Sequence, residues 1–149
     1  MASTVAANKL KVTIKEEIYL KGKNQGAVTE LSISDINEIS NRIITIPTTV
    51  KTIITLSSAV AGGTYIRDNI KYIRVTNLDN TNYVIIGALD TGADTFYIKL
   101  DAGKSFLMGN GVLEAFIDGS VHAAWADIDS ITAQAHTAAC DLEIFIASV

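Results

Sequence analysis

Apolar and polar residues alternate along most of the chain, and this alternation predicts β-strands. In the first such stretch Leu10, Val12 and Ile14 alternate with lysine and threonine, and the pattern breaks at 16–17 and resumes at 18–20. Successive side chains of a strand point to opposite faces, so this pattern indicates a strand with one buried face. This first strand is expected at 9–15. Further strands are expected at 28–33, 42–46, 48–56, 70–78, 82–89, 95–100, 104–108, 112–117 and 140–147.

Short turn signals predict how these strands pair. The strands at 70–78 and 82–89 are separated by only three residues, so we expect an antiparallel hairpin. The strands at 95–100 and 104–108 flank Asp101-Ala102-Gly103 and predict a second hairpin.

Three shorter segments carry more local predictions. Asn24-Gln25-Gly26 predicts an earlier turn. Residues 34–40 are irregular and are expected to form a loop. In the strand at 48–56, the inward-facing residues are expected to be Val50, Ile54 and Leu56.

The region 121–140 is ambiguous. Its alanine content favours a helix by propensity, whereas alternation at 131–136 favours a strand. The strand at 140–147 is expected to place Leu142, Ile144 and Ile146 on one face. Eight to ten short strands predict an all-β fold, an antiparallel β-sandwich with jelly-roll-like character or a small barrel. Residues 1–8 are expected to be a flexible N-terminal arm, and 9–149 a single β-sandwich domain.

Composition narrows the possible functions. The 149 residues are 48% hydrophobic and only 19% charged, which is typical of one folded domain. The low charge also leaves apolar residues for the surface, which indicates oligomerisation or docking. The net charge is −4 and the cations are scattered, so nucleic-acid binding is not expected. No apolar run approaches the roughly 20 residues of a membrane span, and the start does not resemble a secretory signal. The single cysteine, Cys140, allows no internal disulfide.

One motif is typical of catalysis. Residues 89–94, Leu-Asp-Thr-Gly-Ala-Asp, match the active-site turn of retroviral-type aspartic proteases. In that chemistry two carboxylates share a proton across a dimer axis, so Asp90 would be the catalytic residue of each copy.

The rest of the sequence does not support a protease. The family needs a glycine-rich flap well after the aspartate and a later apolar-apolar-Gly segment. Here Gly109-Asn110-Gly111 is too close to Asp90, and the later segment is missing. Because Asp and Gly are also the residues expected in tight turns, the motif is better interpreted as a hairpin turn.

Other candidate groups are weaker. Two histidines and one cysteine without close spacing do not predict a zinc site, and the aspartates lack the spacing of a calcium loop. Gly62-Gly63 and Gly103-Lys104-Ser105 are interpreted as turns rather than phosphate loops. Aromatic residues could line a sugar-binding face, but on strands they are more often core or interface residues. The groups weighed are His122, His136, Cys140, Asp118, Asp127, Asp129, Asp141, Trp125, Tyr65, Tyr72, Tyr83 and Tyr97.

Three stretches carry a resemblance to a known family: 67–84, with Arg-Asp-Asn-Ile-Lys-Tyr-Ile-Arg-Val-Thr-Asn-Leu-Asp; 96–106, with Phe-Tyr-Ile-Lys-Leu-Asp-Ala-Gly-Lys-Ser-Phe; and 131–143. Over about its C-terminal half, the chain resembles small virion structural proteins of tailed phages, of the marine or cyanophage type. The shared pattern is strand, Leu-x-Ala-Gly-x-Ser-Phe, strand.

The resemblance implies a β-sandwich that decorates or cements a capsid, or belongs to a tail or fibre assembly. The expected function is therefore a non-enzymatic virion structural protein, with no catalytic residue, cofactor or metal. Its expected partners are the major capsid protein or other virion proteins. The chain itself is expected to form a homo-oligomer, with a trimer favoured. Two alternatives stay open: the dimeric aspartic protease using Asp90, and a glycan-binding module of a tail appendage.

Overall fold

The computed structural model describes residues 5–90, 95–109 and 128–149. These residues form thirteen strands and one short 3₁₀ turn, η1 (Arg67–Asn69). No helix among them is long and apolar enough to cross a bilayer. The strands are β1 (Asn8–Lys15), β2 (Tyr19–Leu20), β3 (Lys23–Asn24), β4 (Val28–Ile36), β5 (Glu38–Ile46), β6 (Lys51–Ser57), β7 (Tyr65–Ile66), β8 (Ile70–Asn77), β9 (Val84–Asp90), β10 (Thr95–Leu100), β11 (Ser105–Gly109), β12 (Ile128–Ala135) and β13 (Cys140–Ser148).

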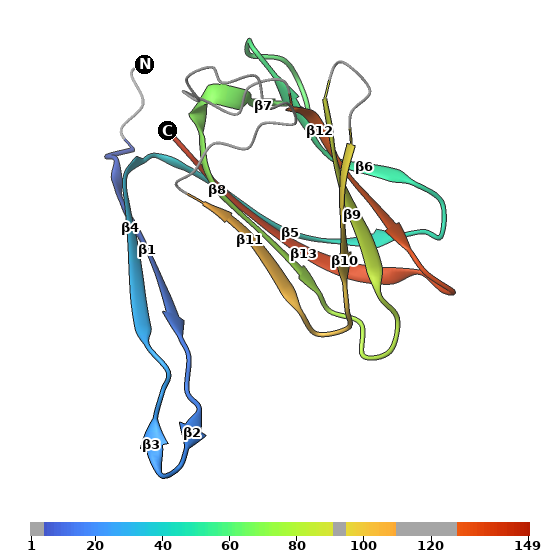
Figure 1. The fold of residues 1–149 in the computed structure, drawn as a ribbon. Coiled ribbons are helices and arrows are strands. Elements are labelled where there is room, and N and C mark those ends of the chain that lie inside the picture. Colours follow the sequence, from blue (N-terminus) through green and yellow to red (C-terminus); the bar gives the residue numbers. More distant parts are fainter. Residues whose placement is uncertain (1–4, 91–94, 110–127) are drawn as a thin grey trace.

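Two sheets pack face to face and form a sandwich (Figure 1). The β5 sheet has the order β11-β8-β13-β5, and the β6 sheet has the order β10-β9-β12-β6-β7. All pairs are antiparallel except the two-residue contact of β6 with β7. Apart from β7, the chain supplies four strands to each sheet and crosses repeatedly between them. This is the jelly-roll arrangement, which confirms the expected all-β sandwich.

The core lies between the two sheets. Leu142, Ile144 and Ile146 of β13 are fully buried there, as their alternation predicts. They meet Ile54 of β6 and Ile131 of β12 from the opposite sheet. The strand interpretation of the ambiguous region is correct for 128–135, because Ile131 and Ala133 face this core. Residues 110–127, with the expected strand at 112–117, lie outside the described part of the chain.

Both predicted sandwich hairpins are wrong. Strand β8 pairs with β11 and β13, whereas β9 pairs with β10 and β12, so β8 and β9 belong to different sheets. Strands β10 and β11 are likewise in different sheets. Packed sheets lie only about 10 Å apart, so a short connection can cross from one sheet to the other as easily as it can close a hairpin.

Three local predictions in the N-terminal third are also wrong. Residues 34–40 are strand rather than loop: β4 runs to Ile36 and β5 begins at Glu38. The chain reverses at Lys21-Gly22, both with positive φ, rather than at 24–26. Val50 is 66% exposed, because β6 begins after it, and a bulge at Ile53 turns that residue inward beside Ile54.

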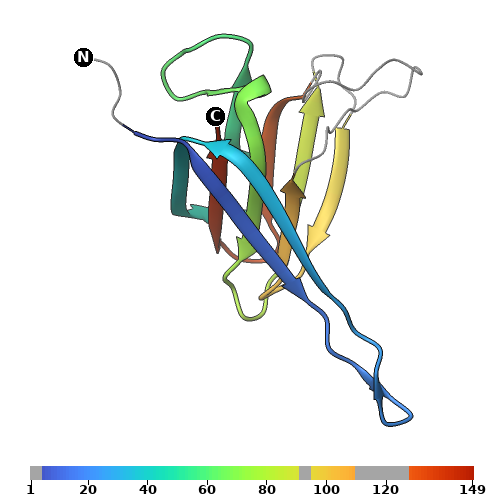
Figure 2. The ribbon, with the colours of Figure 1, turned by 90° about the vertical axis from the view of Figure 1, so that its left-hand side faces the viewer.

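Residues 8–36 form a long hairpin outside the sandwich. Strands β1 and β4 pair antiparallel, and the short pair β2–β3 closes the far end. At its base the hairpin packs on the outer face of the β5 sheet (Figure 1). Seen from the side, it crosses that sheet obliquely and its far end lies beyond the sandwich (Figure 2).

Asn77, at the end of β8, ties two sheet-crossing loops together. Its side chain is fully buried, and its Nδ2 donates to the carbonyl oxygens of Asn82 (2.9 Å) and Leu100 (3.1 Å). Its Oδ1 accepts from the Asp79 amide (3.0 Å). Its backbone exchanges hydrogen bonds with Gly103 and Lys104 of the second loop.

Candidate interaction surface

Asp90 is the last residue of β9 and lies opposite Ile128 of β12. Leu89 is paired with Thr95 of β10, so residues 90–94 connect two adjacent antiparallel strands. This agrees with the interpretation of the Asp-Thr-Gly motif as a hairpin connection. The remaining motif residues, 91–94, lie outside the described residues.

The other polar candidates are dispersed over the described structure. The His136 ring stacks on Tyr83 at 4.4 Å, and Asp129 pairs with Arg67 at 2.6 Å. Burial raises the pKa of the Cys140 thiol, as expected for a small core residue. Within residues 5–90, 95–109 and 128–149, no group of three potential metal ligands comes together. His122, Asp118, Asp127 and Trp125 fall outside these ranges.

The tyrosines considered for sugar binding are divided between the two sheets. Tyr72 is buried under the hairpin, where its ring meets Phe145 edge-on. Tyr97 is exposed on the other sheet, beside Gly87, where an added Cβ would lie 3.0 Å from the Tyr97 ring. Tyr83 is stacked on His136. The two glycine motifs contain Gly63 and Gly103, which both have positive φ, as turns require.

The base of the hairpin is held by a small apolar cluster on the outer face of the β5 sheet. Ile33 and Ile36 are buried against Tyr72 and Ala147, with Phe145 beside them. Half-buried side chains from both hairpin strands complete the cluster: Leu10, Val12 and Leu31. This contact fixes the direction in which the hairpin leaves the sandwich.

Beyond this base the hairpin exposes large apolar side chains. Ile18, Tyr19 and Leu20 at the far end are 51%, 65% and 55% exposed, and Ile14 and Val28 are exposed between them and the base. The far end also carries Lys21 and Lys23 on the tight turn. We call residues 18–24 the hairpin tip. Exposed apolar side chains gathered on one projecting element are typical of an interaction site.

The outer face of the β5 sheet continues this apolar character beside the base. Ile39 and Ile43 of the edge strand β5 are both 65% exposed, and Leu107 of β11 is exposed at the other edge. Between these edges Arg74 pairs with Glu143 at 3.0 Å.

Acid should weaken the fold partly through this ion pair. The hydrogen bond from Arg74 lowers the pKa of Glu143, and backbone N–H groups of Asn82 and Thr81 lower that of Asp79. Because both carboxyl groups have a lower pKa when folded than when unfolded, their contribution is present above the unfolded values, near 4.5 and 3.8, and is lost as the pH falls through the folded ones. We expect the urea concentration at the unfolding midpoint to decrease as the pH is lowered below about 4.5. The urea midpoint of the variant Glu143→Gln should decrease less over the same pH range. If the midpoint of this variant depends on pH as that of the original protein does, the contribution of the Arg74–Glu143 pair is contradicted.

A hollow of about 280 Å³ opens where the hairpin base meets the β5 sheet. Its apolar walls are Leu10, Ile36, Ile39 and Phe145, and its polar lining residues are Asn8, Lys9 and Asn37. The exposed side chain of Ile39 stands at this site, so the hollow and the apolar edge of β5 form one continuous surface.

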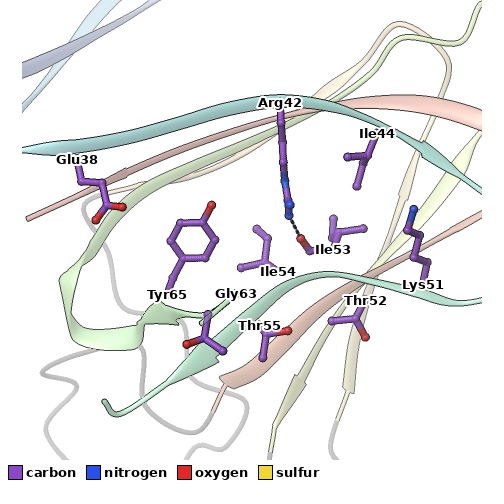
Figure 3. Close-up of a pocket in the computed structure, with 11 residues that line it drawn as sticks. Glu38, Arg42, Ile44, Lys51, Thr52, Ile53, Ile54, Thr55, Gly63 and Tyr65 are labelled. Atoms are coloured by element: carbon purple, nitrogen blue, oxygen red, sulfur yellow. Dashed lines mark hydrogen bonds between the residues drawn. The ribbon is translucent and has the colours of Figure 1, made fainter. Parts of the chain in front are cut away.

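A second and larger concavity, about 510 Å³, lies between the edges of β5 and β6 (Figure 3). Both strands present an edge here that no other described strand covers, apart from the contact of β6 with β7 at Leu56–Ser57. Two cationic side chains bridge the edges. Arg42 of β5 donates to the Ile53 carbonyl oxygen on β6, and Lys51 of β6 donates to the Thr45 carbonyl oxygen on β5 (3.1 Å).

These bridges occupy carbonyl groups that another strand would otherwise use. Lysine and other charged side chains on strand edges are a common protection against edge-to-edge pairing. We therefore expect the double substitution Arg42→Ala and Lys51→Ala to cause concentration-dependent aggregation of folded protein, measured by light scattering. The control is the pair Lys71→Ala and Lys104→Ala, which removes the same charge away from these edges. This control should not cause aggregation. Equal scattering from both pairs would exclude an edge-specific role.

The exposure of the hairpin could not be read from the sequence. Leu10 and Ile14 occupy equivalent places in the same alternating pattern, yet Leu10 packs on the sandwich and Ile14 is exposed. The sequence signal in this part of the chain is Gly22, which suits the second central position of a two-residue hairpin turn.

Comparison with known proteins gives little further guidance. No family model matches the chain, and no curated protein matches it. One solved chain, from a structure described as "Bacillus endospore appendages form a novel family of disulfide-linked pili", aligns over 100% of this chain and 95% of its own length. The sequence identity is 12% and the TM-score 0.43. A likeness at this level carries no conclusion about function.

Proposed function

We propose that the chain is a non-catalytic structural protein of a tailed-phage particle, located on the virion as a decoration or cement protein of the head. The observation that carries the proposal is the hairpin, which leaves a jelly-roll body and exposes five large apolar side chains. The sequence resemblance of the C-terminal half to small virion proteins supports the same class. The proposed partner is the major capsid protein.

The energetics suit docking. Full burial of a large apolar side chain contributes roughly 1.5–3 kcal/mol, and the exposed hairpin residues are about half covered already. Five such residues and the apolar edge of β5 would together contribute several kcal/mol to an interface. Copies joined in a homo-oligomer would bind the repeating lattice through several such interfaces at once, which raises the overall affinity.

A binding measurement tests this function. Purified protein is titrated onto phage heads that lack it, and the bound fraction is measured by co-sedimentation. We expect saturation at a fixed number of copies per head. Binding that stays proportional to concentration, or no binding, would overturn the proposal.

The variant Asp90→Asn separates this function from the protease alternative. A structural role predicts unchanged saturation, since Asp90 ends β9 in the β6 sheet, whereas the proposed contacts lie on the hairpin and the β5 sheet. A protease predicts peptide cleavage at acidic pH by the original protein and its complete loss in Asp90→Asn.

A further inference from the structure

We propose that the concavity between β5 and β6 binds an acidic sugar, a hexuronate unit of a negatively charged polysaccharide. The inference concerns a second site and stands whether or not the protein belongs to a phage particle. Side chains alternate along β5, so Arg42 lines this concavity while Ile39 and Ile43 lie on the outer face that we assign to the head. The two sites therefore use different side chains of the same strand.

The concavity holds two cations that no described carboxylate neutralises. Arg67 and Arg74, the other arginines of the chain, have acidic partners at 2.6 and 3.0 Å. Arg42 and Lys51 form no ion pair with any described residue, and each donates to a backbone carbonyl oxygen instead. That bond holds the Arg42 side chain in place and leaves its other N–H donors for a ligand. A guanidinium held in this way is suited to a carboxylate, which it binds through two parallel hydrogen bonds.

The rest of the lining suits a sugar rather than a bare anion. The Tyr65 ring packs on the core and lies in the concavity near Arg42 (Figure 3). Apolar side chains of Ile44 and Ile54 line it as well. A sugar ring has matching groups, because its C–H faces pack on an aromatic ring and its hydroxyl groups bond to polar residues. The volume of about 510 Å³ is also within the range of roughly 300–1,000 Å³ that is typical of small-molecule sites.

Glu38 gives the concavity two chemically different ends. It lines the same concavity, but its position on β5 is about 13 Å from that of Arg42 at the usual rise of a strand, too far to neutralise it. In Figure 3 the Tyr65 ring stands between these two side chains. The Glu38 carboxylate accepts a long hydrogen bond from Ser148 (3.5 Å) and keeps acceptor sites for hydroxyl groups. An acidic sugar with its carboxylate at Arg42 and its hydroxyl groups towards Glu38 would satisfy both ends.

The two cationic bridges argue against an extended acidic peptide as the ligand. A peptide that adds to a sheet as a further strand needs the free N–H and carbonyl groups of a strand edge. Here the bridges already occupy one carbonyl group on each of the two edges. A sugar binds through side chains and needs no such edge, so the bridges can stay in place when it binds.

The test is a titration followed by the NMR shifts of the backbone amides at neutral pH. The probes are methyl β-glucuronide and methyl β-glucoside, which differ only in a carboxylate that replaces a hydroxymethyl group. We expect saturable shifts at 38–44, 51–55 and 63–65 with the glucuronide. The glucoside should bind at least tenfold more weakly, equivalent to about 1.4 kcal/mol, because it lacks the charge-assisted hydrogen bonds to Arg42. Acetate, a carboxylate without the sugar ring, should also bind at least tenfold more weakly.

Single variants locate the binding site. Arg42→Gln and Lys51→Gln each remove one cation and leave the other bridge between the edges, and light scattering checks that the variants stay dispersed. We expect Arg42→Gln to weaken glucuronide binding at least tenfold and Lys51→Gln to weaken it by a smaller factor. Lys71→Gln is the matched control, because Lys71 also donates to a backbone carbonyl oxygen at 3.1 Å but does not line the concavity. Its affinity for the glucuronide should equal that of the original protein.

Several results would overturn the inference. These are the absence of saturable shifts with the glucuronide, equal affinity for the glucoside or for acetate, and an equal loss of affinity in Lys71→Gln. A capped peptide of alternating valine and glutamate is titrated in parallel. If it binds the same amides more tightly than the glucuronide, the site takes an added strand and the inference is wrong. None of these outcomes depends on binding to heads, so the proposed function is tested separately.

Discussion

Replacing Asn77 with leucine is expected to lower the free energy of unfolding by about 3 kcal/mol, the largest effect of any single polar substitution considered for this protein. Leucine has a similar size but no polar atoms. The carbonyl oxygens of Asn82 and Leu100 and the amide of Asp79 would then lose their partner. Each buried polar group left unpaired costs on the order of 1–3 kcal/mol.

Asn77 matters because it joins two of the loops that carry the chain between the sheets. Thermal unfolding should show a melting temperature roughly 10 °C lower, given about 2–4 °C per kcal/mol for a chain somewhat larger than this one. The control is Asn80→Leu in the same loop, where the side chain is exposed and the change should be within about 0.5 kcal/mol. Equal effects at both positions would show that the loop, and not the buried amide, determines the loss.

Replacing Gly26 with valine should detach the hairpin tip from the rest of the hairpin. A Cβ at this position would collide with the backbone carbonyl oxygen of Glu16 on the facing strand. Backbone cannot move aside as a flexible side chain can, so the hydrogen bonds from Glu16 to Ala27 and from Gln25 to Ile18 should be lost. We expect hydrogen exchange of residues 16–27 to become at least tenfold faster, equivalent to about 1.4 kcal/mol of local stability.

The same variant should leave the sandwich almost unchanged. Gly26 contacts neither of the two apolar clusters, so the melting temperature in dilute solution should shift by no more than about 2 °C. Gly22→Asn is the matched control, because its site has open space and asparagine tolerates positive φ. A large fall in melting temperature for Gly26→Val would show that the tip contributes to the folding of the body.

The fold class could be predicted from the sequence because period-two alternation directly reports half-buried strands. The strand at 140–147 illustrates this, since every residue expected inside is buried there. Strand partners could not be predicted in the same way. The connection between β8 and β9 has the length of a hairpin loop, yet Asn77 and its hydrogen bonds hold it as a crossing between sheets.

The candidate surface was harder to predict than the fold. The pattern of Leu10, Val12 and Ile14 is uniform, but only its first part finds a partner on the β5 sheet. Alternation shows which face of a strand is apolar and not what covers that face. Likewise, the irregular pattern at 34–40 suggested a loop, whereas Asp35 takes a positive φ at a bulge within β4.

The Asp-Thr-Gly motif shows the opposite problem. Its letters match a catalytic turn, but turn residues are also what a connection between paired strands requires. The antiparallel pairing of β9 with β10 gives Asp90 such a place in the structure. A short motif therefore has to be weighed against the local backbone that the same residues favour.

The most direct test of the central claim is to count copies of the protein in purified phage particles by quantitative mass spectrometry. The proposed role in the virion predicts a fixed ratio of this protein to the major capsid protein that persists through repeated gradient purification. If the ratio falls towards zero with purification, the protein is not part of the particle, and the structural account of its exposed hairpin would be contradicted.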